Sequence, residues 1–128
     1  MAINQGKPSK SRVQKRTPDQ PDERVTFNKG QLDSLSLGGL TLAQLTLEPG
    51  WRWSDSLKEV QGTSSCEEPH VIYHISGRLR VRMDDGEEQE FRAGEISLLP
   101  AGHDAWVVGN EPVKALEISG AFKDQEFR

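Results

Sequence analysis

The sequence predicts an all-β domain, a sandwich or barrel built from short strands. Apolar runs are brief, and turn-forming residues interrupt them about every 8 to 12 positions. The segment 78–83, RLRVRM, alternates charged and apolar residues strictly, which is the period-two pattern of a strand with one buried face. No window shows the periodicity of an amphipathic helix. Together these observations favour a closed antiparallel architecture, in which few strand edges stay unpaired.

The predicted strands follow one another from residue 24 onward. A run rich in β-formers at 40–47 ends at the turn Pro49-Gly50, and Asp85-Gly86 marks a hairpin turn. The predicted strands cover 40–47, 71–75, 78–83, 89–92, 95–99, 105–108 and 113–118.

The N-terminal segment differs from the rest of the chain. Residues 1–17 contain five basic residues and no acidic one, and three prolines interrupt 1–23. A segment without apolar periodicity buries too little surface to offset the entropy of ordering, so we expect a disordered tail. The alternative is a basic arm that contacts a polyanion, although no aromatic residue favours contact with bases. We divide the chain into a tail (1–23), a β-barrel (24–122) and a C-terminal tail (123–128).

Composition restricts the classes of partner and compartment. The chain has 128 residues, a net charge of −4 and a pI near 5.4, so nucleic acid is not an expected partner. No apolar stretch approaches the roughly 20 residues that span a bilayer, and no secretory signal is visible. The single cysteine cannot form an intrachain disulfide and suits a reducing compartment. We therefore expect a cytoplasmic protein with no membrane partner.

The segment from Pro49 to Gly120 resembles the cupin superfamily, on the spacing of its glycines and proline. The first cupin motif is G-x5-H-x-H-x3–4-E-x6-G. Gly77 fits its last glycine, and His70 then takes the place of the glutamate. Cys66 takes the place of the second histidine at the shorter spacing, and Ser64 that of the first.

The second cupin motif, G-x5-P-x-G-x2-H-x3-N, fits in its framework but not in its ligand. Gly94, Pro100 and Gly102 match at full spacing. The place of the histidine is taken by Ala105, and His103 lies two residues earlier. The resemblance implies a jelly-roll barrel, the cupin double-stranded β-helix, with a Cys/His variant of the metal site.

The three residues Cys66, His70 and His103 form the candidate metal site. Thiolate and neutral imidazole suit a borderline-soft divalent ion, so zinc, iron, nickel or copper is expected. Glu67 or Glu68 would supply a fourth donor. Each ligand also has a structural alternative: the histidines as interior or exposed residues, and the cysteine as a filler of space.

Strand parity extends this candidate site to a pocket. His70, Ile72 and His74 share one face of their strand, and His103, Ala105 and Val107 share a face of theirs. His74 lies about 13 Å along the strand from His70 and cannot bind the same ion; its structural alternative is a buried histidine. The pocket candidates are Trp53, Glu68, Ile72, His74 and Ala105.

The sequence leaves three functions open. The first is a metal-binding small cupin with a pocket for a polar small molecule such as a sugar or organic acid, with metal-dependent catalysis left open. The second is a non-catalytic ligand-binding or sensory module without metal, and the third a structural subunit with a filled barrel. A homodimer is expected because residues 71–75 are apolar on both faces. A second subunit or the segment 25–27 would cover the outer face.

Overall fold

A computed structural model describes residues 12–66 and 70–119 of the chain. The described part consists of β-strands and two helices of one turn each, α1 (Trp53–Ser56) and α2 (Lys58–Gln61). The strands are β1 (Glu23–Phe27), β2 (Gly30–Leu37), β3 (Leu40–Leu47), β4 (His70–Ser76), β5 (Arg78–Met83), β6 (Glu88–Arg92), β7 (Ile96–Leu99), β8 (His103–Val108) and β9 (Val113–Ser119). The all-β prediction is confirmed.

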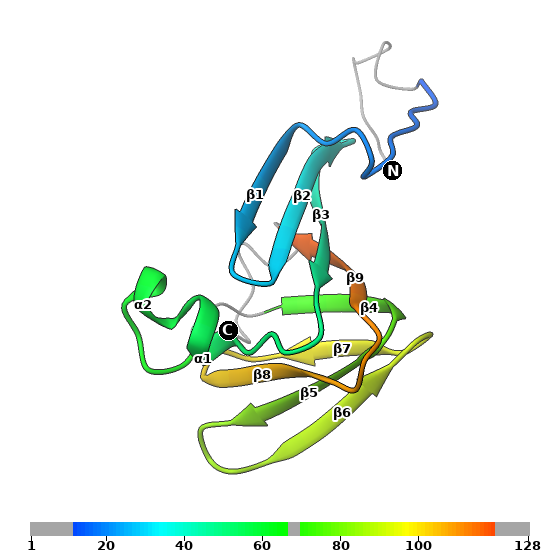
Figure 1. Cartoon of the computed structure of the whole chain (residues 1–128). Coiled ribbons are helices and arrows are strands. Elements are labelled where there is room, and N and C mark those ends of the chain that lie inside the picture. Colours follow the sequence, from blue (N-terminus) through cyan, green and yellow to red (C-terminus); the bar gives the residue numbers. More distant parts are fainter. Residues whose placement is uncertain (1–11, 67–69, 120–128) are drawn as a thin grey trace.

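The strands form two antiparallel sheets. The larger has the order β1-β2-β3-β9-β4-β7 and the smaller the order β6-β5-β8. Because β4 and β5 follow one another but belong to different sheets, the chain crosses between layers at this point. Figure 1 shows β5, β6 and β8 at the bottom and β1, β2 and β3 of the larger sheet at the top, with α1 and α2 at the left side. This is the jelly-roll arrangement that the sequence predicts.

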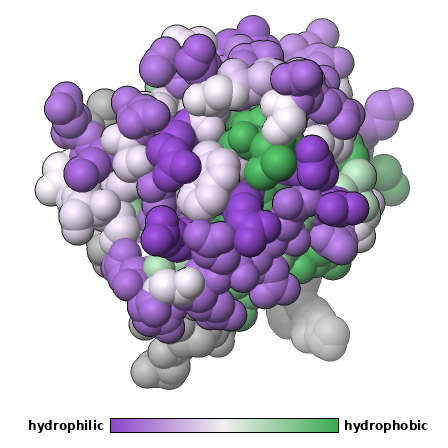
Figure 2. All heavy atoms as spheres, turned by 60° about the horizontal axis from the view of Figure 1, so that its bottom comes forward, coloured by the Kyte–Doolittle hydropathy of each residue, from purple (hydrophilic) through white to green (hydrophobic). Residues whose placement is uncertain are grey.

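The core lies between the two sheets and follows from strand alternation. In β5, Leu79 and Val81 are buried, whereas the arginines of this strand point outward. Those arginines pair with Glu88 and Glu90 of β6. Figure 2, in which the lower side of Figure 1 comes forward, shows mainly hydrophilic side chains. The smaller sheet therefore has one apolar face toward the core and one charged face toward solvent.

The turn between β4 and β5 requires a glycine at position 77. This glycine joins β4 to β5 with φ of 78°, a conformation that disfavours residues with a Cβ. A Cβ there would also lie 2.5 Å from the carbonyl oxygen of Pro112. Gly94 and Gly102, the other two glycines that fit the cupin motifs, also have positive φ.

Four elements, the strands β1 and β2 and the helices α1 and α2, were not among the predicted ones. β1 and β2 were missed because β2, GQLDSLSL, contains glycine, aspartate and serine, which are poor strand formers. Buried Asp33 on β2 accepts hydrogen bonds from Arg24 and Gln31 and holds these strands together. The helices are too short to produce a periodic pattern. Neither helix in the described ranges is long and apolar enough to cross a membrane.

The N-terminal segment makes contacts in the part that the structure describes. Arg16 donates hydrogen bonds to Asp22 and to the carbonyl oxygen of Ser36, and Gln14 accepts one from the backbone of Gly38. These contacts attach residues 14–16 to β2 and to the turn after it. Residues 1–11 and 120–128 lie outside the described residues, so the expected domain boundaries stay predictions.

Candidate metal centre

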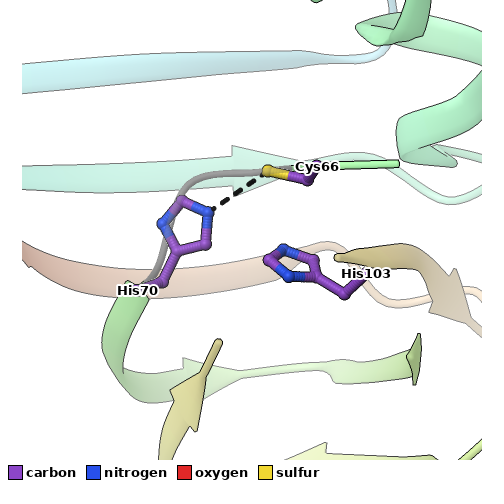
Figure 3. Close-up of side chains that lie close together, drawn as sticks. All are labelled: Cys66, His70 and His103. Atoms are coloured by element: carbon purple, nitrogen blue, oxygen red, sulfur yellow. Dashed lines mark hydrogen bonds between the residues drawn. The ribbon is translucent and has the colours of Figure 1, made fainter. Parts of the chain in front are cut away.

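Cys66, His70 and His103 converge at one end of the barrel. One potential ligand atom of each lies within 4.8 Å of those of the other two. Cys66 lies ahead of β4, His70 is the first residue of β4, and His103 is the first residue of β8. Figure 3 shows the three side chains pointing toward one another. The structure therefore brings together the three residues that the sequence nominates as metal ligands.

The backbone fixes Cys66 and His103 relative to each other. The two residues form an isolated antiparallel bridge. The Cys66 N–H donates to the His103 carbonyl at 2.7 Å, and the His103 N–H donates to the Cys66 carbonyl at 3.2 Å. Side chains of directly paired residues lie on the same side of a sheet. β8 begins at His103, two residues earlier than predicted, because its pairing with β5 extends to Met83 and His103.

A backbone carbonyl orients the ring of His103. Its Nδ1–H donates a hydrogen bond of 2.8 Å to the carbonyl oxygen of Pro100. The lone pair of Nε2 is then the one left for a ligand, an arrangement typical of histidines that bind metals. His103 is only 3% exposed, so the ring is held in place by its surroundings.

A carboxylate orients the ring of His70 in the same manner. His70 Nδ1–H donates to Glu117 Oε2 at 2.5 Å, and Nε2 lies 3.6 Å from Cys66 Sγ. Glu117 is on β9 and pairs with Ile72 of the adjacent β4. The sequence reasoning missed Glu117. The available signal was its parity, because an acidic residue shares the inward face of β9 with Val113 and Ala115.

The electrostatics of this end of the barrel favour a positive charge. Burial disfavours the charged form of His70, but hydrogen bonds and charge from Cys66 and Glu117 outweigh that effect. Together they raise the pKa of His70 to about 10. A positive charge is thus favoured between the sulfur of Cys66 and the carboxylate of Glu117.

The distance between the ligand atoms of Cys66 and His70 matches that in a tetrahedral metal site. Bonds of about 2.3 Å to sulfur and 2.05 Å to nitrogen at a tetrahedral angle separate the two ligand atoms by about 3.6 Å. The observed Sγ to Nε2 distance between Cys66 and His70 is 3.6 Å. The other separations, at up to 4.8 Å, exceed tetrahedral values by up to roughly 1.5 Å, so the ligands would have to draw closer together around an ion. The donor set therefore suits the ion that the sequence predicts.

A cavity of about 100 Å³ adjoins the three residues. Cys66, His70 and His103 line it, together with Glu117 and Gln61. Its remaining lining is apolar and comprises Phe27, Leu45, Leu47, Trp51, Trp53, Leu57, Ile72, Leu79, Leu99 and Ala105. Of the predicted pocket residues, Trp53, Ile72 and Ala105 thus line this cavity.

Asp104 fixes the position of α1, the helix that contributes Trp53 to the cavity lining. The Ser54 backbone N–H donates to Asp104 Oδ1 at 3.1 Å, and Arg52 pairs with the other oxygen at 3.3 Å. This carboxylate from β8 holds the start of α1, and α1 carries Trp53 at 3% exposure. The indole N–H groups of Trp51 and Trp53 reach neither solvent nor an acceptor in the described part of the chain.

The structure places the pocket candidate His74 elsewhere. His74 is 1% exposed, lies within hydrogen-bonding distance of Ser97 (2.9 Å) and stacks on Phe91. It is not among the residues that line the cavity beside His70. Burial lowers the pKa of His74, and the charge of Glu95 opposes this in part. Glu67 and Glu68 lie outside the described residues.

Comparisons with known sequences identify no relative. No protein-family model matches the chain, and no curated protein matches it. Solved structures do share its fold. A protein of unknown function from Rhizobium leguminosarum has a TM-score of 0.60 at 20% identity, covering 84% of this chain and 95% of its own.

Two enzymes have similar folds. The polyketide cyclase RemF from Streptomyces resistomycificus has a TM-score of 0.59 at 16% identity, with 84% of this chain and 78% of RemF covered. An oxalate decarboxylase from Bacillus subtilis has a TM-score of 0.55 at 22% identity, covering 84% of this chain. The chain spans only 29% of that decarboxylase. At these identities the likeness concerns the fold alone, and the fold of this chain is that of the cupins.

Proposed function

We propose that the protein is a small metal-binding cupin that holds a divalent transition metal through Cys66 Sγ and the Nε2 atoms of His70 and His103. The observation that carries the proposal is the orientation of both imidazoles. Each Nδ1–H is engaged by a fixed acceptor, Pro100 or Glu117, so Nε2 is the nitrogen that can bind the ion. In His70 this nitrogen faces the sulfur of Cys66 at 3.6 Å, and an ion would take the place of the proton between them.

One thiolate and two imidazoles leave a coordination position for water or for a small molecule in the cavity. Zinc, iron, nickel and copper all accept this donor set. When bound, the ion would polarise an oxygen of such a molecule and lower the pKa of coordinated water. The cytoplasm, where thiols stay reduced, is the compartment that would keep Cys66 available as a ligand.

The test is metal content measured by elemental mass spectrometry on tag-free protein. We expect near-stoichiometric metal in the parent protein, and less than about a tenth of it in Cys66→Ser, His70→Ala and His103→Ala. Tyr73→Ala is the matched control, because Tyr73 is on the opposite face of β4 and 44% exposed. Circular dichroism would verify that every variant retains its β-structure.

Two outcomes would contradict the proposal. One is a parent that stays metal-free after incubation with zinc, iron, nickel and copper salts. The other is unchanged metal content in the three ligand variants. Either result would favour the second candidate, a ligand-binding or sensory module that uses the cavity without metal.

We also propose that the chain forms a homodimer through the outer face of β4 and β7. Tyr73 and Ile96 are paired across these strands and are 44% and 70% exposed, and Leu98 is 54% exposed. β7 is the last strand of its sheet, so its outer edge has no paired strand among residues 12–66 and 70–119. The segment 25–27, the alternative cover, belongs to β1 at the opposite edge. A second copy would bury both the apolar face and the edge.

Leu98→Lys tests the dimer. We expect the parent to sediment as a dimer and the variant as a monomer in analytical ultracentrifugation, because a charge in the interface is costly to desolvate. Val25→Lys is the control, since Val25 is 43% exposed at the far edge of the same sheet. A monomeric parent, or equal effects of both variants, would contradict this interface.

A further inference from the structure

We infer that the cavity binds a compact neutral molecule, with an apolar body and a single oxygen donor that faces the metal, in preference to a sugar or an organic acid. This inference rests on the proposed metal site. It names the class of ligand, and it differs from the polar molecule expected from the sequence.

The lining of the cavity is mostly apolar. Ten of the fifteen residues around the cavity are apolar. Two of these are Trp51 and Trp53, whose indole nitrogens are buried and inaccessible to water. The indoles therefore present aromatic carbon to the cavity. A ligand with several hydroxyl groups would leave most of them without hydrogen-bond partners against such walls.

Most polar groups of the lining belong to one cluster. Four of the five polar lining residues belong to one cluster, formed by the three ligands and Glu117. The fifth is Gln61 of α2. Polar recognition is thus concentrated at the metal, and apart from Gln61 the rest of the lining favours an apolar group.

The charges of the proposed metal site balance without a charged ligand. A divalent ion carries two positive charges, and the thiolate of Cys66 and the carboxylate of Glu117 supply two negative ones. No lysine or arginine is found among the described residues that line the cavity. A carboxylate ligand would add an uncompensated charge in a largely apolar site, which is unfavourable. A neutral carbonyl or hydroxyl oxygen keeps the balance at zero.

The size of the cavity limits the ligand. Its volume is about 100 Å³, whereas an apolar cavity of about 150 Å³ accommodates benzene. In proportion, an apolar body of about four non-hydrogen atoms is the upper range that fits without movement of the walls.

The experiment compares three probes with equal numbers of non-hydrogen atoms: isobutyramide, isobutyrate and glycerol. Isobutyramide and isobutyrate have the same shape and differ in charge, and glycerol replaces apolar groups by hydroxyls. Binding to zinc-loaded protein is measured by isothermal titration calorimetry, with zinc content determined on the same samples. We expect isobutyramide to bind at least about tenfold more tightly than either of the others.

Two variants sharpen the test. Glu117→Gln removes one negative charge, so at saturating zinc it should shift the preference toward isobutyrate by about tenfold. A structural role of Glu117 would weaken both probes equally. Ala105→Leu fills the cavity and should abolish binding with zinc content unchanged, whereas Ala93→Leu, in an exposed turn, should have no effect on either.

The outcomes separate the two proposals. Zinc uptake with equal or tighter binding of isobutyrate or glycerol overturns the inference alone and leaves the metal site standing. Zinc uptake without binding of any probe also overturns it. Failure to retain zinc overturns the proposed function, and the inference with it.

Discussion

His70 and His74 lie on the same strand and the same face, yet their surroundings are opposite. His70, at the start of β4, lies between Cys66 and Glu117, and its pKa is raised to about 10. His74, four residues later, packs on Phe91 and contacts Ser97, and burial lowers its pKa. One end of the strand is built for a cation and the other for a neutral ring.

The difference shows that strand parity determines which way a side chain points but not what it does. Both histidines point inward, as predicted. Their roles follow from what the neighbouring strands place opposite them: Glu117 of β9 beside His70, and Ser97 of β7 beside His74. The comparison predicts that changes at His74 affect folding, and that changes around His70 affect the metal.

The largest expected effect is on the free energy of unfolding, from a change at His74 of β4. His74→Ala removes a ring that is 1% exposed and should lower the free energy of unfolding by about 2 to 4 kcal/mol, through the cavity and the lost contact with Ser97. Urea denaturation monitored by tryptophan fluorescence measures this. Arg82→Ala, at an outward position of β5, is the control and should stay within about 0.5 kcal/mol. A loss below 1 kcal/mol at His74 would break the comparison.

The next largest expected effect is on metal affinity, from a change beside His70. Glu117→Gln should weaken metal binding about 10- to 100-fold, because the carboxylate orients His70 and increases its basicity. Competition with a chromogenic chelator measures the affinity. His74→Gln is the matched variant and should bind metal as the parent does. Equal weakening by both substitutions would mean that Glu117 acts only on the fold.

The smallest effect is a dependence on pH. The pKa of His74 is lowered from its ordinary value of 6.5, so the unfolded chain takes up this proton at a higher pH than the folded protein. The stability contributed by neutral His74 is present above about pH 6.5 and is lost as the pH falls through the lowered pKa. His74→Gln should remove this part of the decline, which cannot exceed about 1.4 kcal/mol per pH unit. Parallel curves for parent and variant between pH 5 and 6.5 would contradict it.

The predictable parts of the molecule are those that local rules decide. Strict alternation located β5, and three glycines that fit the cupin spacing occupy backbone conformations with positive φ. Such constraints act within a few residues and are visible in a single sequence. β2 was missed because its stability comes from pairing and from the buried Asp33, not from the propensities of its residues.

The site was predictable only in part, for the same reason. His70 and Cys66 are four residues apart, and motif spacing brings them together. Glu117 is 47 positions from His70, so its contribution depends on the pairing of β9 with β4. The lining by Phe27 and Leu45 likewise requires the complete sheet order. The apolar character of the cavity was therefore not visible before the fold.

The position of the metal ligands has a mechanical consequence. His70 belongs to β4 of the larger sheet, and His103 to β8 of the smaller one. An ion shared by the two would act as a cross-link between the layers, in a chain whose single cysteine excludes an internal disulfide. Separation of the sheets and release of the ion would then be one event, and a chelator would loosen the whole barrel rather than only its mouth.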